Sequence, residues 1–207
     1  MIRTLTWLAL VAAGASAAAA APADEQRWTP EELRMLHDYT RCVVEANPNQ
    51  TARLLKLDYR TASYRRSLQN LAASTRHCSR VGGRLRMSRV LLAGSAAEAL
   101  LPRALAGRPL DSAVALDPAK TPIQARDDGE YLGLCAVRSM PGPVAALLAT
   151  APGSEAEKRA LAAVTPGLSP CLRAGAAATL NRPAVRALVA LAAYRIVTQA
   201  GPAPEGS

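Results

Sequence analysis

The four cysteines of this chain form two pairs with identical spacing, and this spacing constrains the fold more than any other feature. Cys42 and Cys78 are 36 positions apart, and so are Cys135 and Cys171. Sliding the chain by 93 positions therefore places each cysteine of the first pair on a cysteine of the second. A fixed offset of this kind predicts an internal duplication.

The same offset aligns further residues. It gives 14 identities over the 58 positions that start at Cys42, without a gap. An alanine-rich sequence produces chance matches between alanines, but it does not align Cys, Pro, Gly and Arg as well. We interpret the matched arginines and glycines as residues with a structural role in each copy: Arg66 with Arg159, Arg80 with Arg173, Arg89 with Arg182, and Gly82 with Gly175.

Composition and helix signals predict an all-α fold. Aromatic residues make up 3% of the chain and Phe is absent, which is unfavourable for a β-sandwich or barrel. Thr29 to Glu32 and Ser154 to Glu157 match the capping box, and Asn181 can cap a last helix. We expect about four helices in each of two similar units, residues 28–105 and 127–198. Residues 106–126 would link the units, and 199–207 would form a flexible tail.

The first 23 residues predict a secretory signal peptide. Arg3 is followed by an apolar run and then by small residues. Cleavage is expected after Ala20 or Ala23, because Pro22 disfavours cleavage directly before it. The alternative is an uncleaved membrane anchor, but the strongly apolar part is short, and no later apolar run is long enough to span a bilayer. The mature chain is therefore expected to be periplasmic or secreted.

Export favours disulfide bonds between the cysteines. An even number of cysteines in an oxidising compartment is typical of a disulfide framework. The duplication favours one bond inside each unit, Cys42–Cys78 and Cys135–Cys171, and pairing between the units is the alternative. Each bond would close a loop of roughly 37 residues, which corresponds to about 3.5–4 kcal/mol in the chain-entropy model.

No motif for catalysis, for a metal or for a cofactor is recognisable. His37 and His77 do not have the spacing of metal ligands relative to the cysteines. Asp127, Asp128 and Glu130 gather at an expected helix start, where the helix dipole explains acidic residues. We therefore expect no catalytic residues, and a non-enzymatic protein that is structural or binds another protein or an envelope component.

The basic charge supplies a second hypothesis. The net charge is +9, and the first unit carries far more of it than the second. An arginine-rich face could bind a polyanion such as anionic lipid, a cell-wall polymer or nucleic acid. A solvated basic face without a ligand is the simpler interpretation. The arginines of this candidate face surround a glycine pair: Arg76, Arg80, Arg84, Arg86 and Arg89.

Overall fold

The computed structural model describes residues 28–79, 88–116, 122–173 and 181–199, and every regular element in these ranges is a helix. The predicted all-α class is confirmed. The predicted signal peptide and nearly all of the predicted tail lie outside the described residues. In chain order the elements are α1 (Pro30–Ala46), α2 (Pro48–Lys56), α3 (Ala62–Ser74), η1 (Arg76–Cys78), α4 (Arg89–Leu105), α5 (Leu110–Ala113), α6 (Asp128–Ser139), α7 (Pro141–Leu148), α8 (Glu155–Val164), η2 (Thr165–Cys171) and α9 (Arg182–Val197).

Two predicted helix starts are confirmed by their caps. The Thr29 hydroxyl accepts a hydrogen bond from the Glu32 amide, and the Glu32 carboxylate accepts one from the Thr29 amide at 2.7 Å. The side chain of Asn181 accepts from the Ala184 amide at the start of α9. Each cap satisfies amide groups that have no partner inside the helix.

The capping box predicted at the start of α8 is only half formed. Ser154 accepts from the Glu157 amide, as expected. The Glu157 carboxylate instead accepts from the Gly153 amide at 2.7 Å and pairs with Arg186. The Glu157 carboxylate pairs with the buried Arg186 and does not complete the capping box with the Ser154 amide. An unpaired buried charge would cost more free energy than one missing cap hydrogen bond.

The region between α6 and α7 and the linker also differ from expectation. The sequence Pro141-Gly142-Pro143 predicts a break before a helix over residues 144–150, but α7 begins at Pro141 itself. Proline is tolerated in a first helical turn, where its missing amide hydrogen has no partner in any case. The predicted linker contains the short helix α5.

No single described helix is long and apolar enough to span a membrane, whereas α6 and α7 meet this criterion only as a pair bent by 107°.

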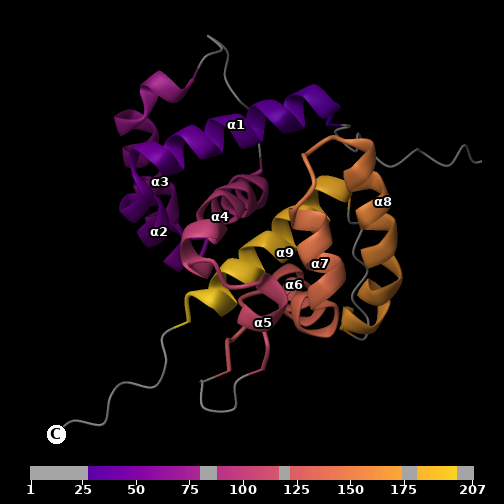
Figure 1. Ribbon diagram of the computed structural model, residues 1–207. Helices are drawn as coiled ribbons and strands as arrows, with labels where there is room; N and C mark the ends of the chain where they lie inside the picture. Colours follow the sequence, from indigo (N-terminus) through magenta and orange to yellow (C-terminus); the bar gives the residue numbers. More distant parts are fainter. Residues whose placement is uncertain (1–27, 80–87, 117–121, 174–180, 200–207) are drawn as a thin grey trace, which may run out of the picture.

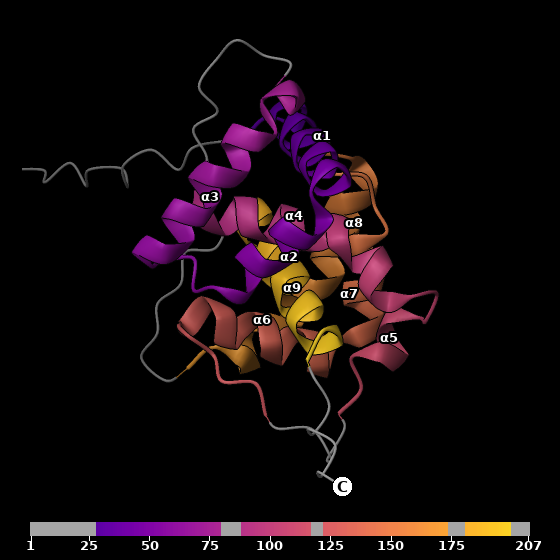
Figure 2. The same ribbon diagram turned by 90° about the vertical axis from the view of Figure 1, so that its left-hand side faces the viewer.

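Helices α4 and α9 cross at the centre of the molecule (Figure 1). A Cβ atom at Gly94 would overlap the Cα and Cβ atoms of Ala187, so the two backbones are in direct contact at the crossing. Helix α1 packs on α4, and α6 packs on α9, which places α1–α3 and α6–α8 on opposite sides of the crossing (Figure 2). Every residue from Val185 to Tyr194 is buried, so α9 is covered on all faces.

Both disulfides join a long helix to a 3-10 helix of the same half of the chain, η1 after α3 or η2 after α8. Cys42 of α1 is bonded to Cys78 of η1, and Cys135 of α6 is bonded to Cys171 of η2. The Cα–Cα distance is 5.6 Å in each bond. The predicted pairing is confirmed, and the crossed alternative is wrong.

Candidate functional site

A buried arginine of α9 forms the centre of the first charged cluster. The Arg186 side chain is 3% exposed and makes a two-pronged contact with Glu98 of α4, at 2.5 and 2.9 Å. It also pairs with Glu157 of α8 at 2.9 Å. It also donates to the carbonyl of Leu147 in the last turn of α7. Two further hydrogen bonds go to the hydroxyl and the carbonyl of Thr150, which lies just after α7. One guanidinium therefore joins α4, α7, α8 and α9.

His37 of α1 lies beside this cluster. Its Nδ1 atom is 3.9 Å from Glu98, and its Nε2 atom is 3.5 Å from the hydroxyl of Ser95. Burial, followed by the positive charge of Arg186, lowers the pKa of His37 to about 4. The ring is consequently neutral at physiological pH, and it shares a hydrogen bond with Ser95 without adding charge beside the cluster.

A second charged cluster lies nine residues further along α9. Arg195 forms an ion pair with Glu130 of α6, whose side chain is 1% exposed. The second oxygen of this carboxylate accepts from the Arg126 amide at 2.6 Å. The Arg126 side chain then donates to the carbonyls of Leu57 and Lys56 at the end of α2. The cluster therefore joins α9 and α6 to the first half of the chain.

The acidic residues before and within α6 have separate roles. Asp127 is the N-cap and accepts from the Glu130 amide at 2.8 Å, which fits the predicted placement at a helix start. It also accepts a 2.6 Å hydrogen bond from the hydroxyl of Tyr59. Glu130 was expected to be stabilised by the helix dipole alone, and that expectation is incomplete because the side chain is buried and paired with Arg195.

Residues of the predicted arginine-rich face are only partly described. Arg76 and Arg89 are exposed, whereas Arg80, Arg84 and Arg86 lie outside the described residues. Arg89 donates to the carbonyls of Tyr59 and Arg60, both at 3.2 Å, and so fixes the start of α4 against the loop before α3. Recurrence of this arginine at Arg182 predicts a buried or two-pronged ion pair, but the exposed Arg89 bonds two carbonyls instead.

The other matched positions also have surface environments where they are described. Arg66 and Arg159 are exposed on α3 and α8, and Arg182 is exposed at the start of α9. Arg173 pairs with Asp128 at 3.2 Å, and its guanidinium lies 4.4 Å from the centre of the Tyr131 ring. It therefore bonds a side chain at the start of α6 rather than helix-end carbonyls. Gly82 and Gly175 lie outside the described residues.

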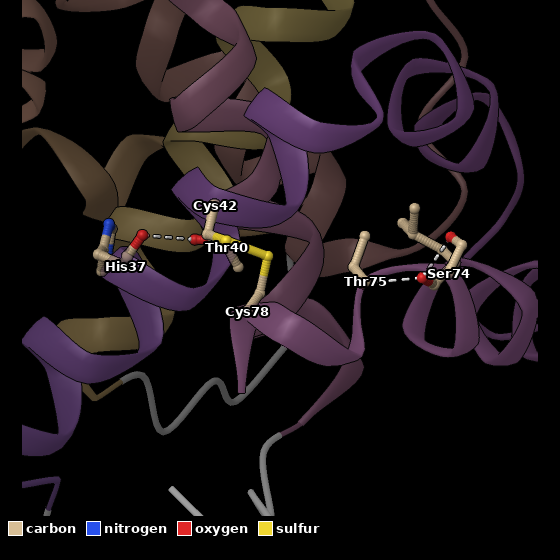
Figure 3. The surroundings of a disulfide bond; sticks show 7 residues. His37, Thr40, Cys42, Ser74, Thr75 and Cys78 are labelled. Carbon is tan, nitrogen blue, oxygen red and sulfur yellow. Dashed lines mark hydrogen bonds between the residues drawn. A yellow bond between two sulfur atoms is a disulfide. The ribbon is translucent and has the colours of Figure 1, made fainter. Parts of the chain in front are cut away.

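The first disulfide, between Cys42 and Cys78 (Figure 3), is part of a cysteine–histidine cluster. The sulfur atoms of Cys42 and Cys78 and a ring nitrogen of His77 lie within 4.8 Å of one another. Metal ions bind cysteine as the thiolate. Because both sulfurs are bonded to each other, they are not available as thiolate ligands in this state.

The hydroxyl of Tyr64 is a buried polar group without a hydrogen-bond partner among the described residues. The side chain is 0% exposed on the inner face of α3. Burial raises the pKa of Tyr64 to about 12, so the phenol is neutral at physiological pH. Its aromatic ring fills the core between the helices of the first half.

A groove of about 650 Å³ lies beside α8, η2 and the start of α9. Its lining is mostly aliphatic, with side chains such as Leu161, Leu168 and Val185. Lys158 and Arg182 are its two cationic lining residues. Sequence patterns missed this groove because its residues come from four separate elements.

Comparison of the chain with protein-family models, with curated protein sequences and with solved structures gives no match.

Proposed function

We propose that the chain is an exported, non-enzymatic protein built from two tandem copies of one helical unit, with a structural or protein-binding role outside the cytoplasm. The observation that carries this proposal is the pair of disulfides, one in each half of the chain. Disulfides persist in oxidising compartments and are rare in the cytosol. The signal-like first 23 residues point to the same compartment.

The positions of the helices support the duplication. Helices α2 and α7 begin at Pro48 and Pro141, and α4 and α9 begin at Arg89 and Arg182. Both pairs of starts are 93 positions apart, which is also the offset between the two disulfides. Divergence of a single ancestral unit accounts for this common offset.

Contacts between the halves support a two-fold arrangement of the two copies. Gly94 and Ala187 occupy corresponding positions, and they meet at the crossing of α4 and α9. Residues at corresponding positions touch each other only near a two-fold axis. On one side of this axis Gly153 lies against Pro30, and on the other Tyr59 bonds Asp127. In both places the loop after the second helix of one unit, α2 or α7, contacts the start of the first helix of the other unit, α6 or α1.

The buried charged side chains pair with one another, and this pairing supports a structural role. Arg186 pairs with both Glu98 and Glu157, and Glu130 pairs with Arg195. An ion pair satisfied in this way fixes the relative position of the helices that carry it. We therefore assign these ionisable groups to holding the two units together.

Mass spectrometry of the protein isolated from its native source tests export. The expected mass corresponds to loss of residues 1–20 or 1–23 and of four hydrogen atoms, because both disulfides are formed. Retention of the first 23 residues with all four thiols reduced would contradict the proposal. Native electrophoresis of the isolated envelope fraction tests the binding role, with migration as a complex larger than the 21.7 kDa chain expected. Migration as the free chain alone would contradict that role.

Binding of a polyanion by the first unit is the second candidate function. The observation in its favour is that Arg65, Arg66 and Arg76 are exposed on α3 and η1, near the predicted face. Retention on immobilised heparin across a salt series measures this binding, because each released counterion adds to the salt dependence.

Arg84→Glu combined with Arg86→Glu is expected to lower the salt concentration at which the protein elutes from heparin. Arg138→Glu combined with Arg159→Glu makes the same change of charge at exposed positions of the second unit, and it serves as the control. Equal losses of retention in both double variants would indicate a general effect of net charge and would exclude a site in the first unit.

A further inference from the structure

The groove beside α8 is bordered by an apolar floor and an exposed leucine. Leu132, Leu161, Leu168 and Val185 form the floor, and each is less than a tenth exposed. Leu172 lies at the same groove and is 39% exposed, which is unusual for a large aliphatic side chain in this fold. The volume of about 650 Å³ lies within the range of pockets that bind small molecules.

Positive charge is concentrated at the groove. Lys158 and Arg182 both line it, and both act on one carboxylate, that of Glu155. The hydrogen bond from Lys158, at 2.5 Å, is the main cause of the lowered pKa of Glu155, and Arg182 adds to it. Lys158 is paired with Glu155, whereas Arg182 forms no ion pair among the described residues, so the charge of Arg182 remains available to a ligand.

We propose that this groove binds a single-chain anionic amphiphile of the fatty-acid type, with its acyl chain on the leucine-lined floor and its carboxylate at Lys158 and Arg182. The proposal goes beyond the function proposed above and does not depend on the duplication. An acyl chain requires apolar surface and no hydrogen bonds along its length. An extended peptide would also require partners for its amides and carbonyls. The lining offers few, and the hydroxyl of Thr165 already donates to the Leu161 carbonyl.

Isothermal titration calorimetry with dodecanoate, below its micelle concentration, tests the acyl-chain site. The purified protein is expected to bind one dodecanoate with micromolar affinity. Ala162 lines the groove at an exposed helix position, so Ala162→Glu places a charge in the path of the chain. We expect this variant to bind at least about tenfold more weakly. Ala163→Glu makes the same change one residue away, outside the lining, and is expected to bind as the original protein does.

Ala162→Met tests the same site without a charge, because the longer side chain fills the groove and remains compatible with a helix. It keeps the test valid if Ala162→Glu unfolds, which circular dichroism detects. A lack of dodecanoate binding by the original protein would overturn the proposal. Equal weakening by Ala162→Glu and Ala163→Glu, or unchanged binding by Ala162→Met, would overturn it as well.

Comparison of dodecanoate with dodecanol tests the head-group assignment. The original protein is expected to prefer the carboxylate by about tenfold, through charge-assisted hydrogen bonds. Lys158→Gln combined with Arg182→Gln should abolish this preference while retaining binding of dodecanol. Equal affinity of the original protein for both compounds would overturn the proposed role of the two cations.

Discussion

At the scale of single residues, the core contains charges whose removal has unequal consequences. Arg186 supplies all its donors to one cluster, and Glu98 and Glu157 depend on it for neutralisation. A buried ion pair adds little stability compared with a well-packed apolar core, whereas loss of one partner leaves an uncompensated charge. The cost of a substitution therefore depends on what remains behind in the cluster.

Arg186→Met is expected to lower the free energy of unfolding by about 3–5 kcal/mol, because two carboxylates stay buried without their cation. Urea denaturation followed by circular dichroism measures this change. Arg138→Met removes an exposed arginine from α6 and should change stability by no more than about 0.5 kcal/mol. Equal effects of the two substitutions would show that the buried cluster contributes nothing specific.

His37 makes stability dependent on pH in a defined range. Its pKa falls from the ordinary value of 6.5 to about 4 in the folded protein, mainly through burial. The unfolded chain therefore binds a proton that the folded chain excludes. The resulting stabilisation is complete above pH 6.5 and is lost as the pH falls toward 4, by on the order of 3 kcal/mol in total.

Urea denaturation at several pH values between 7 and 4 measures this dependence. His37→Gln should flatten the decrease across that interval, because glutamine does not titrate. His77→Gln replaces an exposed histidine and should leave the original slope intact. A slope that is unchanged in His37→Gln would exclude His37 as its source.

At the scale of elements, the packing of α4 on α9 depends on the absence of a side chain. Gly94 allows the backbone of α4 to contact Ala187 of α9. Gly142, in the first turn of α7, has open space where its Cβ would lie. The contact between α4 and α9 therefore requires glycine at position 94, whereas a larger residue fits at position 142.

Gly94→Ala is expected to lower the free energy of unfolding by about 1–3 kcal/mol, because the added methyl group forces α4 and α9 apart. Gly142→Ala should raise it by up to about 1 kcal/mol, since alanine loses less backbone freedom on folding. Thermal denaturation of the two variants measures both effects. A Gly94→Ala variant as stable as the original protein would show that the crossing can relax without cost.

Most helices could be predicted from the sequence because their signals are local. Capping residues located the starts of α1, α8 and α9 to within a residue, and the equal cysteine spacing located both disulfides. The start of α7 was wrong because Pro141 was interpreted as a separator, whereas the first turn of a helix accepts proline. Local sequence does not reveal which of these two roles a proline takes.

The ion-pair clusters and the groove could not be predicted in this way. Glu98 and Arg186 are 88 positions apart, and no local pattern links them. An available signal was overlooked: Arg186 lies among apolar residues on every side of α9, so its burial requires a counter-charge. The groove depends on how α6, α8, η2 and α9 meet, and that packing follows from the whole fold.

At the scale of the molecule, both halves share one apolar core. Residues from α1, α4, α6 and α9 belong to a single contiguous cluster, and the crossing of α4 and α9 joins the two sides. A smaller cluster unites Leu36 of α1, Leu91 of α4 and Ala187 of α9, and Trp28 packs against it. The halves are therefore expected to unfold together.

Coincident denaturation curves from two probes test this cooperativity. Fluorescence of Trp28 reports on the contact between α1, α4 and α9, while far-ultraviolet circular dichroism reports on all helices. The two transitions should have the same midpoint in urea with the disulfides intact. Two separated transitions would show that each half is an independent folding unit.

The position of α9 in the chain determines when the fold can be completed. It is the last of the described helices to leave the ribosome, yet it supplies Arg186 and Arg195 to the two charged clusters and the surface on which α4 and α6 pack. Until about residue 197 has been synthesised, Glu98 and Glu130 have no cation from α9, and the core lacks its central helix. A nascent chain therefore cannot complete its core before α9 has been synthesised, and a chain that stays incompletely folded until then is compatible with the export proposed above.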